Sequence, residues 1–220
     1  MRWLAIDTSS GSAVGVVEQV DDELVVRAQA YAEDPRAHVE DLAPMVQRCL
    51  AQSGWRARQL DAIVVGTGPA LFTGLRIGIA TATSLARSVG CAAYGVCSLD
   101  GIALQHPGAA VVVTDARRGE VYWAGYQPEN GIPGALVLTH PPSVGAVTEA
   151  QAWAQRHQAT LVGPAVGLYQ LQGQAQLRVR ATPLVQRVQY RLAHGDLAPL
   201  TPQYLRRPDI HSTGARKRVS

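Results

Sequence analysis

The stretch V-V-G-T-G-P-A-L-F-T-G-L-R-I-G-I-A-T-A-T-S-L-A-R-S-V, residues 64–89, decides the fold. It begins within the short apolar run of residues 62–65, which is typical of a buried parallel strand. Gly66, Gly68 and Pro69 then mark a tight turn. From residue 74 onwards apolar side chains recur every three or four residues, and Gly90 has the position of a C-cap. The stretch therefore predicts a strand, a glycine-rich turn and a helix.

The predicted helix has a second face of mostly small residues. Gly74, Gly78, Thr81 and Leu85 lie four, three and four residues apart. Two glycines inside a helix cost about 1 kcal/mol each relative to alanine, so we expect close approach by another backbone to offset that cost. The neighbour is either a second helix of the same domain or the helix of a partner protein. The turn could also hold an anion at the helix N-terminus, although a plain strand-to-helix turn uses the same glycines.

Three segments carry a family resemblance. G-P-A-L-F-T-G-L-R-I-G, residues 68–78, resembles the G-P-G-S-F-T-G-L-R-I-G signature of the TsaB family, formerly YeaZ. D-A-R-R-G-E-V-Y, residues 115–122, and P-Q-Y-L-R, residues 202–206, are also similar to segments of that family. Ala70 and Leu71 replace the Gly and Ser of the signature, which disfavours a tight phosphate cradle. The resemblance spans nearly the whole chain, although residues 127–195 carry little of it.

Both halves of the chain contain a strand, an aspartate, a polar turn and a returning strand. Asp7 follows the first such strand, with Ser10 in its turn, and Asp115 follows the second. The repeat and the resemblance imply an α/β chain with a two-lobed actin-like (ribonuclease-H-like) duplicated fold and mixed sheets. We place the lobes at residues 1–106 and 107–208.

The two turns occupy the positions of the phosphate loops in the actin-like ATPases, which the pattern resembles. In an active member the aspartate serves metal and water near the phosphates. Alternatively, Asp7 only caps its own turn. In the second turn, Arg117 and Arg118 either bind an anionic ligand or RNA, or pair with Asp115 and Glu120.

Composition limits the possible functions. The chain has 220 residues, of which 47% are hydrophobic and 17% charged, and its net charge is +3. Lys217 is the only lysine, which excludes a P-loop lysine and a Schiff-base lysine. The odd number of cysteines predicts buried free thiols in a cytoplasmic protein. We expect no membrane contact, because no apolar run approaches about 18 residues and no signal peptide precedes the first strand.

The residues do not assemble into a recognisable catalytic site. The sequence lacks C-x-x-C, H-E-x-x-H, G-x-S-x-G and G-x-x-x-x-G-K-[ST] motifs. Catalytic relatives of the TsaD type carry an H-x-x-x-H metal pair, but here Leu42 stands four residues after His38. We therefore expect no catalytic residue and no metal ligand, with Asp7, Ser10 and Asp115 as remnants of phosphate loops. No cofactor of its own is expected, and ATP would be bound only by an assembled complex.

The resemblance implies a non-catalytic, activating subunit of the complex that installs the threonylcarbamoyl group on adenosine next to the anticodon of tRNA. It implies a catalytic TsaD-type subunit and an ATPase subunit as partners, a homodimer when alone, and tRNA contact only through the complex. The alternative is a stand-alone actin-like ATP-dependent small-molecule kinase or a glycoprotease-like peptidase. The expected partner surface consists of His38, Leu42, Met45, Gly74, Gly78, Ile79, Thr81 and Leu85.

Basic residues gather at the end of the chain. Arg216, Lys217 and Arg218 lie within residues 209–220, for which we predict a disordered basic tail. The alternative is that this tail touches RNA phosphate.

Overall fold

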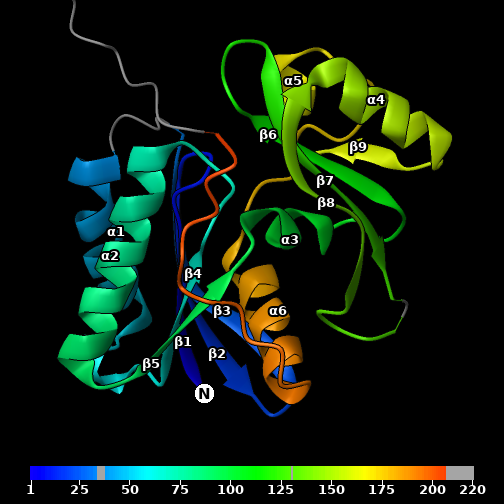
Figure 1. Cartoon of the computed structure of the whole chain (residues 1–220). Coiled ribbons are helices and arrows are strands. Elements are labelled where there is room, and N and C mark those ends of the chain that lie inside the picture. Colours follow the sequence, from blue (N-terminus) through cyan, green and yellow to red (C-terminus); the bar gives the residue numbers. More distant parts are fainter. Residues whose placement is uncertain (34–37, 130, 207–220) are drawn as a thin grey trace, which may run out of the picture.

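The computed structural model describes residues 1–33, 38–129 and 131–206, and these form two mixed β-sheets with helices packed around them (Figure 1). The first sheet has the order β3-β2-β1-β4-β5 and the second the order β8-β7-β6-β9. In the first sheet the strands are β1 (Arg2–Asp7), β2 (Ser12–Val20), β3 (Glu23–Ala32), β4 (Ala62–Gly66) and β5 (Ala92–Val96). In the second they are β6 (Ala110–Asp115), β7 (Glu120–Pro128), β8 (Leu136–Ala146) and β9 (Thr160–Val162).

The two sheets repeat one pairing pattern. β1 is antiparallel to β2 and parallel to β4, and β6 is likewise antiparallel to β7 and parallel to β9. Short turns connect the antiparallel pairs, whereas helices make the longer parallel crossovers. The expected duplicated fold with mixed sheets is therefore confirmed.

The stretch that decides the fold has the predicted form. β4 leads through the glycine-rich turn into α2 (Phe72–Val89), and Gly90 ends the helix in the left-handed conformation with φ of 77°. α2 and α1 (His38–Ser53) cover one face of the first sheet (Figure 1). Their apolar sides meet large side chains of β1 and β4, such as Ile6, Ile63 and Val65.

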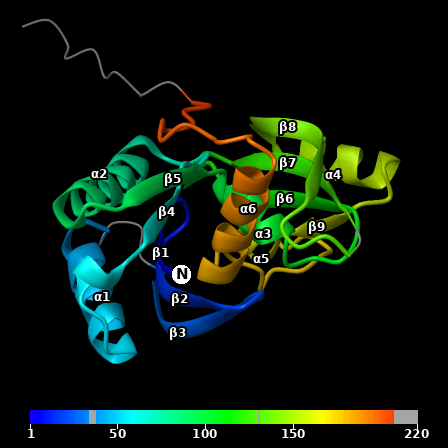
Figure 2. The ribbon, with the colours of Figure 1, turned by 90° about the horizontal axis from the view of Figure 1, so that it is seen from below.

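The opposite face of the first sheet is covered by α3 (Ser98–Ala103) and α6 (Ala181–Ala193) (Figure 2). Leu184, Val185 and Val188 of α6 share one apolar cluster with Trp3 of the first sheet and Val112 of the second. The core is thus continuous between the sheets. The boundary near residue 106 stays a prediction, but a helix from the second half of the chain packs on the sheet formed by the first half.

A third cluster lies on the far side of the second sheet. There α4 (Val147–Arg156) and α5 (Pro164–Leu168) pack against β6, β7 and β9. A 3₁₀ turn at Ala57–Gln59 precedes β4. β8 continues through Pro141 and Pro142. β8 is an edge strand, where a missing proline N–H breaks no ladder bond on the solvent side.

Three further observations bear on the predictions. Cys49 and Cys97 are buried, Cys91 is half-buried, and all three thiols are free. None of the described helices has the length and apolar character needed to cross a membrane. The predicted tail, residues 209–220, lies outside the described residues.

Candidate functional site

Asp7 closes its own turn and also holds the glycine-rich turn. Its side chain is 1% exposed. Oδ1 accepts hydrogen bonds from the N–H and the hydroxyl of Ser9, at 2.9 and 2.6 Å, and Oδ2 accepts one from the Ser98 hydroxyl at 2.5 Å. The Ser98 oxygen accepts in turn from the N–H of Gly68 at 3.1 Å. Asp7 therefore caps its own turn and also contacts the glycine-rich turn through Ser98.

This network explains why residue 66 is a glycine. A Cβ on Gly66 would lie 1.7 Å from Oδ2 of Asp7, so only glycine fits there. Cys97 has the N-cap position of α3 without a side-chain cap, and the Ser98 hydroxyl donates to Asp7. Ser10, the other residue predicted in this turn, accepts a hydrogen bond from the Tyr31 hydroxyl on its carbonyl oxygen at 3.2 Å.

The second turn is also closed by its own side chains. Oδ1 of Asp115 accepts hydrogen bonds from the N–H of Arg117 at 2.8 Å and from the Tyr169 hydroxyl at 3.1 Å. The Arg117 guanidinium lies 3.3 Å from Oδ2 of Asp115. The salt-bridged interpretation of Arg117 thus holds, whereas Glu120 pairs with Arg206 from the end of the described chain.

A C-terminal strap, residues 196–206, connects the two turns (Figure 1, orange to red). Near its middle, the N–H of Gln203 donates to the carbonyl of Thr67 in the glycine-rich turn at 2.8 Å. The ring of Tyr204 packs at a tilt against the ring of Phe72 of α2, with ring centroids 4.7 Å apart. At its end Arg206 donates to the carbonyl of Ala116 at 2.6 Å. The strap therefore ties the first sheet to the β6–β7 turn of the second.

The structure corrects four members of the expected partner surface. Leu42 and Met45 are only 1% and 2% exposed and belong to the core beneath α1. Gly74 and Gly78 are also buried. The neighbour of these two glycines is the turn after β1, because the Thr8 hydroxyl donates to the Gly74 carbonyl at 2.8 Å.

Gly78 is required by the same contact. A Cβ added there would lie 2.4 Å from the Thr8 hydroxyl oxygen. The helix glycines therefore let α2 approach the turn that carries Asp7. Ile79, Thr81 and Leu85, the other α2 members of the expected surface, are half-buried. His38 begins α1, but its side chain lies outside the described part of the chain.

The outward side of these two helices, which we call the outer α1–α2 face, was not singled out in the sequence analysis. Its positions could have been identified as those that fall outside the apolar spacing of each helix. Its side chains are exposed and mostly small or polar: Ala43, Pro44 and Gln47 on α1, and Thr73, Ala80 and Ser84 on α2.

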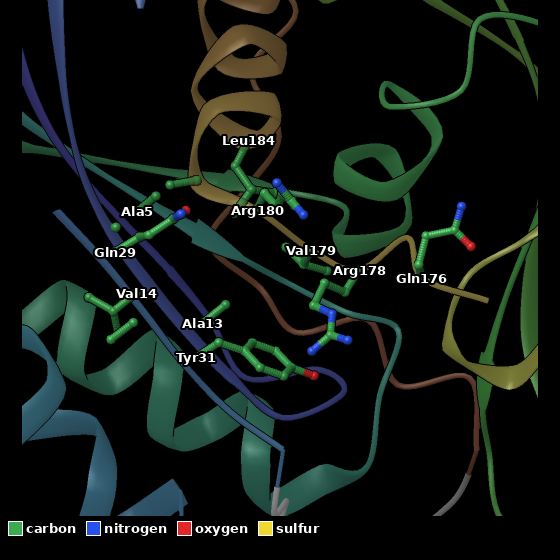
Figure 3. A pocket seen from close by; sticks show the side chains of 13 residues that line it. Ala5, Ala13, Val14, Gln29, Tyr31, Gln176, Arg178, Val179, Arg180 and Leu184 are labelled. Carbon is green, nitrogen blue, oxygen red and sulfur yellow. The ribbon is translucent and has the colours of Figure 1, made fainter. Parts of the chain in front are cut away.

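A cavity of about 490 Å³ lies on the other face of the first sheet, between β1–β3 and the segment that leads into α6 (Figure 3). Arg178 lies over the ring of Tyr31, 4.6 Å from its centroid, and pairs with Glu33 at 3.2 Å. Burial raises the pKa of the Tyr31 hydroxyl, and the nearby Arg178 partly offsets the rise. Among the described residues, no group of three His, Cys, Asp or Glu side chains could hold a metal ion.

Comparisons with known proteins agree with this architecture. Residues 31–132 match the family model described as TsaD, tRNA N6-adenosine threonylcarbamoyltransferase. The chain is 41% identical to an uncharacterised protein of Mycobacterium tuberculosis, over 94% of this chain and 92% of the relative. It is also 41% identical to the tRNA threonylcarbamoyladenosine biosynthesis protein TsaB of Escherichia coli, over 60% of this chain and 58% of the relative.

A solved structure of YeaZ from Pseudomonas aeruginosa aligns with a TM-score of 0.72 at 26% identity, covering 93% of this chain and 99% of that one. A second Pseudomonas aeruginosa structure, described as similar to peptidase YEAZ, aligns with a TM-score of 0.74 at 27% identity and the same coverage. These matches lead to one conclusion: the chain belongs to the TsaB (YeaZ) family.

Proposed function

We propose that this protein is an accessory subunit in the formation of threonylcarbamoyladenosine next to the anticodon of tRNA. The observation that carries the proposal is the likeness to proteins named for this biosynthesis in Escherichia coli, Bacillus subtilis and Haemophilus influenzae. In this role the chain scaffolds and activates a catalytic TsaD-type subunit. It acts in the cytoplasm, where tRNA is modified.

The accessory role, rather than a catalytic one, is supported by how the two turns are used. Asp7 and Asp115 are each hydrogen-bonded within the chain by neighbouring side chains. At the position of the second histidine of the catalytic relatives' metal pair, Leu42 is buried in the core. We therefore propose that the isolated protein hydrolyses neither ATP nor peptides, and that ATP is bound only by the assembled complex.

The outer α1–α2 face, together with the half-buried Thr81, is the proposed contact with the TsaD-type subunit. Small side chains such as Ala43, Ala80 and Ser84 let a partner helix approach closely. The same face would pair two copies when the protein is alone. An ATPase subunit completes the complex, and tRNA is reached through the partners.

The proposal is tested by binding to the TsaD-type protein of the same organism, measured by calorimetry and by co-purification with and without tRNA and ATP. Ala80→Arg adds a long charged side chain to the outer face and should weaken binding about tenfold or more, equivalent to about 1.4 kcal/mol. Ala152→Arg, at an exposed position of α4, is the matched control and should bind normally. Full-strength binding by a normally melting Ala80→Arg variant would contradict the interface.

A separate assay addresses the alternative of a stand-alone kinase or peptidase. The pure protein is incubated with ATP or with peptides, and turnover is measured. We expect none. Turnover that disappears on Asp7→Ala or Asp115→Ala would overturn the accessory role, whatever the binding result.

A further inference from the structure

Four exposed arginines gather toward the ends of α1 and α2. Figure 1 shows the two helices side by side, with their last turns at the same end of the first sheet. The 3₁₀ turn that follows α1 packs on α2, and residues of both line one surface cavity of about 490 Å³: Arg56, Ala57, Arg58, Ser88 and Val89. The four arginines, which we call the basic edge, are Arg48 of α1, Arg56, Arg58 and Arg87 of α2. A positively charged edge therefore borders the outer α1–α2 face.

The basic edge is not neutralised by the described part of the chain. Six arginines elsewhere pair with carboxylates: Arg27, Arg117, Arg178, Arg187, Arg191 and Arg206. No arginine of the basic edge forms an ion pair with another described residue. A helix end favours a nearby cation, which accounts for Arg87 but not for Arg48 inside α1 or for Arg58 in a 3₁₀ turn of three residues. The Asp61 carboxylate, which follows this turn, accepts a hydrogen bond from the backbone N–H of Arg2 at 2.6 Å.

The basic edge also continues the proposed contact surface. Ala80, Ser84 and Arg87 are four and three residues apart and form one row along α2. On α1, Arg48 comes four residues after Pro44 of the outer face. A partner helix that lies along the small side chains would therefore reach these arginines with its end or with the segment attached to it.

From this arrangement we propose that the basic edge binds an acidic segment of the TsaD-type subunit at the rim of their interface. The inference rests on the proposed function and adds to it the charge of the partner's matching surface. Guanidinium groups bind carboxylates through paired hydrogen bonds. Complementary charges at the rim of an interface act mainly on the rate of association, because they steer the two proteins together before contact.

A second copy of this chain matches the basic edge less well. When two copies pair through this face about a two-fold axis, the basic edge meets either itself or the first halves of α1 and α2. Those halves carry Glu40, Asp41 and Arg76, so that two carboxylates and one guanidinium give a net charge of −1 against the +4 of the edge. Self-pairing thus leaves most of the arginine charge unmatched, whereas an acidic partner segment neutralises it.

The test measures how fast charge variants of the full chain associate with the TsaD-type subunit of the same organism. Rates are recorded by surface plasmon resonance at about 0.05 M and about 0.5 M salt, where screening is weak and strong. Arg58→Glu together with Arg87→Glu should slow association about tenfold or more at low salt, and most of this loss should disappear at high salt. Arg58→Gln together with Arg87→Gln should give a smaller loss of the same kind. Both double variants should melt like the wild type, because they break no described ion pair.

A matched control separates the basic edge from the net charge of the protein. Arg156→Glu together with Arg180→Glu changes the net charge equally, at exposed positions in α4 and just before α6, and should associate like the wild type. The inference is overturned, and the proposed function stands, if the reversal of Arg58 and Arg87 leaves association unchanged or if the control loses as much. A wild-type chain that does not bind the subunit at all contradicts both.

Two further measurements, made without the partner, examine the other possible occupants of the basic edge. Sedimentation measures self-association, and a titration measures binding of an anticodon-stem RNA. The inference is overturned if the reversal of Arg58 and Arg87 abolishes either one while association with the subunit stays intact. That result would assign the basic edge to a second copy or to RNA.

Discussion

Nε of Arg187 on α6 donates a hydrogen bond of 2.9 Å to Oδ2 of Asp100 on α3, and the two side chains are only 12% and 8% exposed. Oδ1 of Asp100 accepts a second bond from the Tyr126 hydroxyl on β7 at 2.9 Å. Arg187 also donates to the carbonyl of Gly134 at 2.9 Å. This buried pair therefore joins the helices on the first sheet to the second sheet, with both charges hydrogen-bonded.

Loss of Arg187 should strongly destabilise the fold. Arg187→Met leaves the Asp100 carboxylate buried without its counter-charge, which costs about 3–5 kcal/mol. Unfolding in urea measures the change. Arg27→Met is the matched control, because Arg27 pairs with Glu18 at an exposed site, where ion pairs contribute about 1 kcal/mol or less. Equal destabilisation by both variants would show that the buried pair has no special role.

Added bulk at Gly78 should destabilise the isolated protein rather than only its complex. Gly78→Leu forces α2 away from Thr8 and should cost roughly 1–3 kcal/mol as overpacking. The melting temperature of the lone chain should fall by several degrees, since about 1 kcal/mol shifts it by about 2–4 °C at this size. Ala80→Leu, exposed on the same helix, should melt close to the wild type. An unchanged melting temperature for Gly78→Leu would contradict the contact with Thr8.

Stability should decrease at alkaline pH. Burial raises the pKa of the Cys97 thiol, and burial together with the nearby Asp100 carboxylate raises the pKa of the Tyr126 hydroxyl. In the unfolded chain these groups ionise near their ordinary pKa values of about 8.5 and about 10. The unfolded state then holds fewer protons than the folded state, so the free energy of unfolding falls as pH rises.

The contribution of these two groups is therefore complete below about pH 8.5 and is lost above it, at up to about 1.4 kcal/mol per pH unit for each group. Urea midpoints measured from about pH 7 to about pH 10.5 give the slope. The double variant Cys97→Ala, Tyr126→Phe should have a shallower slope than the wild type. A wild-type midpoint that stays constant or rises with pH would show the opposite linkage.

Removal of the C-terminal strap should matter, whereas removal of the basic tail should not. The sequence shows no hydrophobic periodicity after Leu205, so truncation after Pro208 should keep the melting temperature of the full chain. Truncation after Thr201 also removes Gln203, Tyr204 and Arg206, which contact both sheets, and should lower it by several degrees. Equal melting of the two truncated chains would contradict the structural role of the strap.

The sequence predicted local structure well where apolar residues followed one clear periodicity along the whole element. The strand of residues 62–65 and the helix that Gly90 ends have the predicted form, because apolar spacing and end signals agree there. The duplicated fold followed from two strand–Asp–turn–strand repeats. The course of β8 through Pro141 and Pro142 could not be predicted, because proline rules do not distinguish an edge strand from a central one.

The predicted partner surface was less accurate for a different reason. A helix face made of apolar or small residues indicates that another element packs against it, but the spacing of these residues does not identify that element. Leu42 and Met45 pack against the chain's own sheet, and Gly78 packs against Thr8, which lies 70 positions earlier in the sequence. The cavity was missed because its lining comes from three strands near the start of the chain and from residues 176–184, which lie far away in the sequence.

The position of α6 has a consequence for synthesis of the protein on the ribosome. When residues 1–106 have left the exit tunnel, Trp3, Ala5 and Val64 still lack the side chains of Leu184, Val185 and Val188 that cover them in the native structure. Apart from the part that α3 covers, this face of the first sheet therefore stays uncovered until α6 (Ala181–Ala193) has been translated. Contacts this distant in sequence slow folding and leave apolar surface available to chaperones. The nascent first sheet should thus be a chaperone client whose release coincides with the emergence of α6.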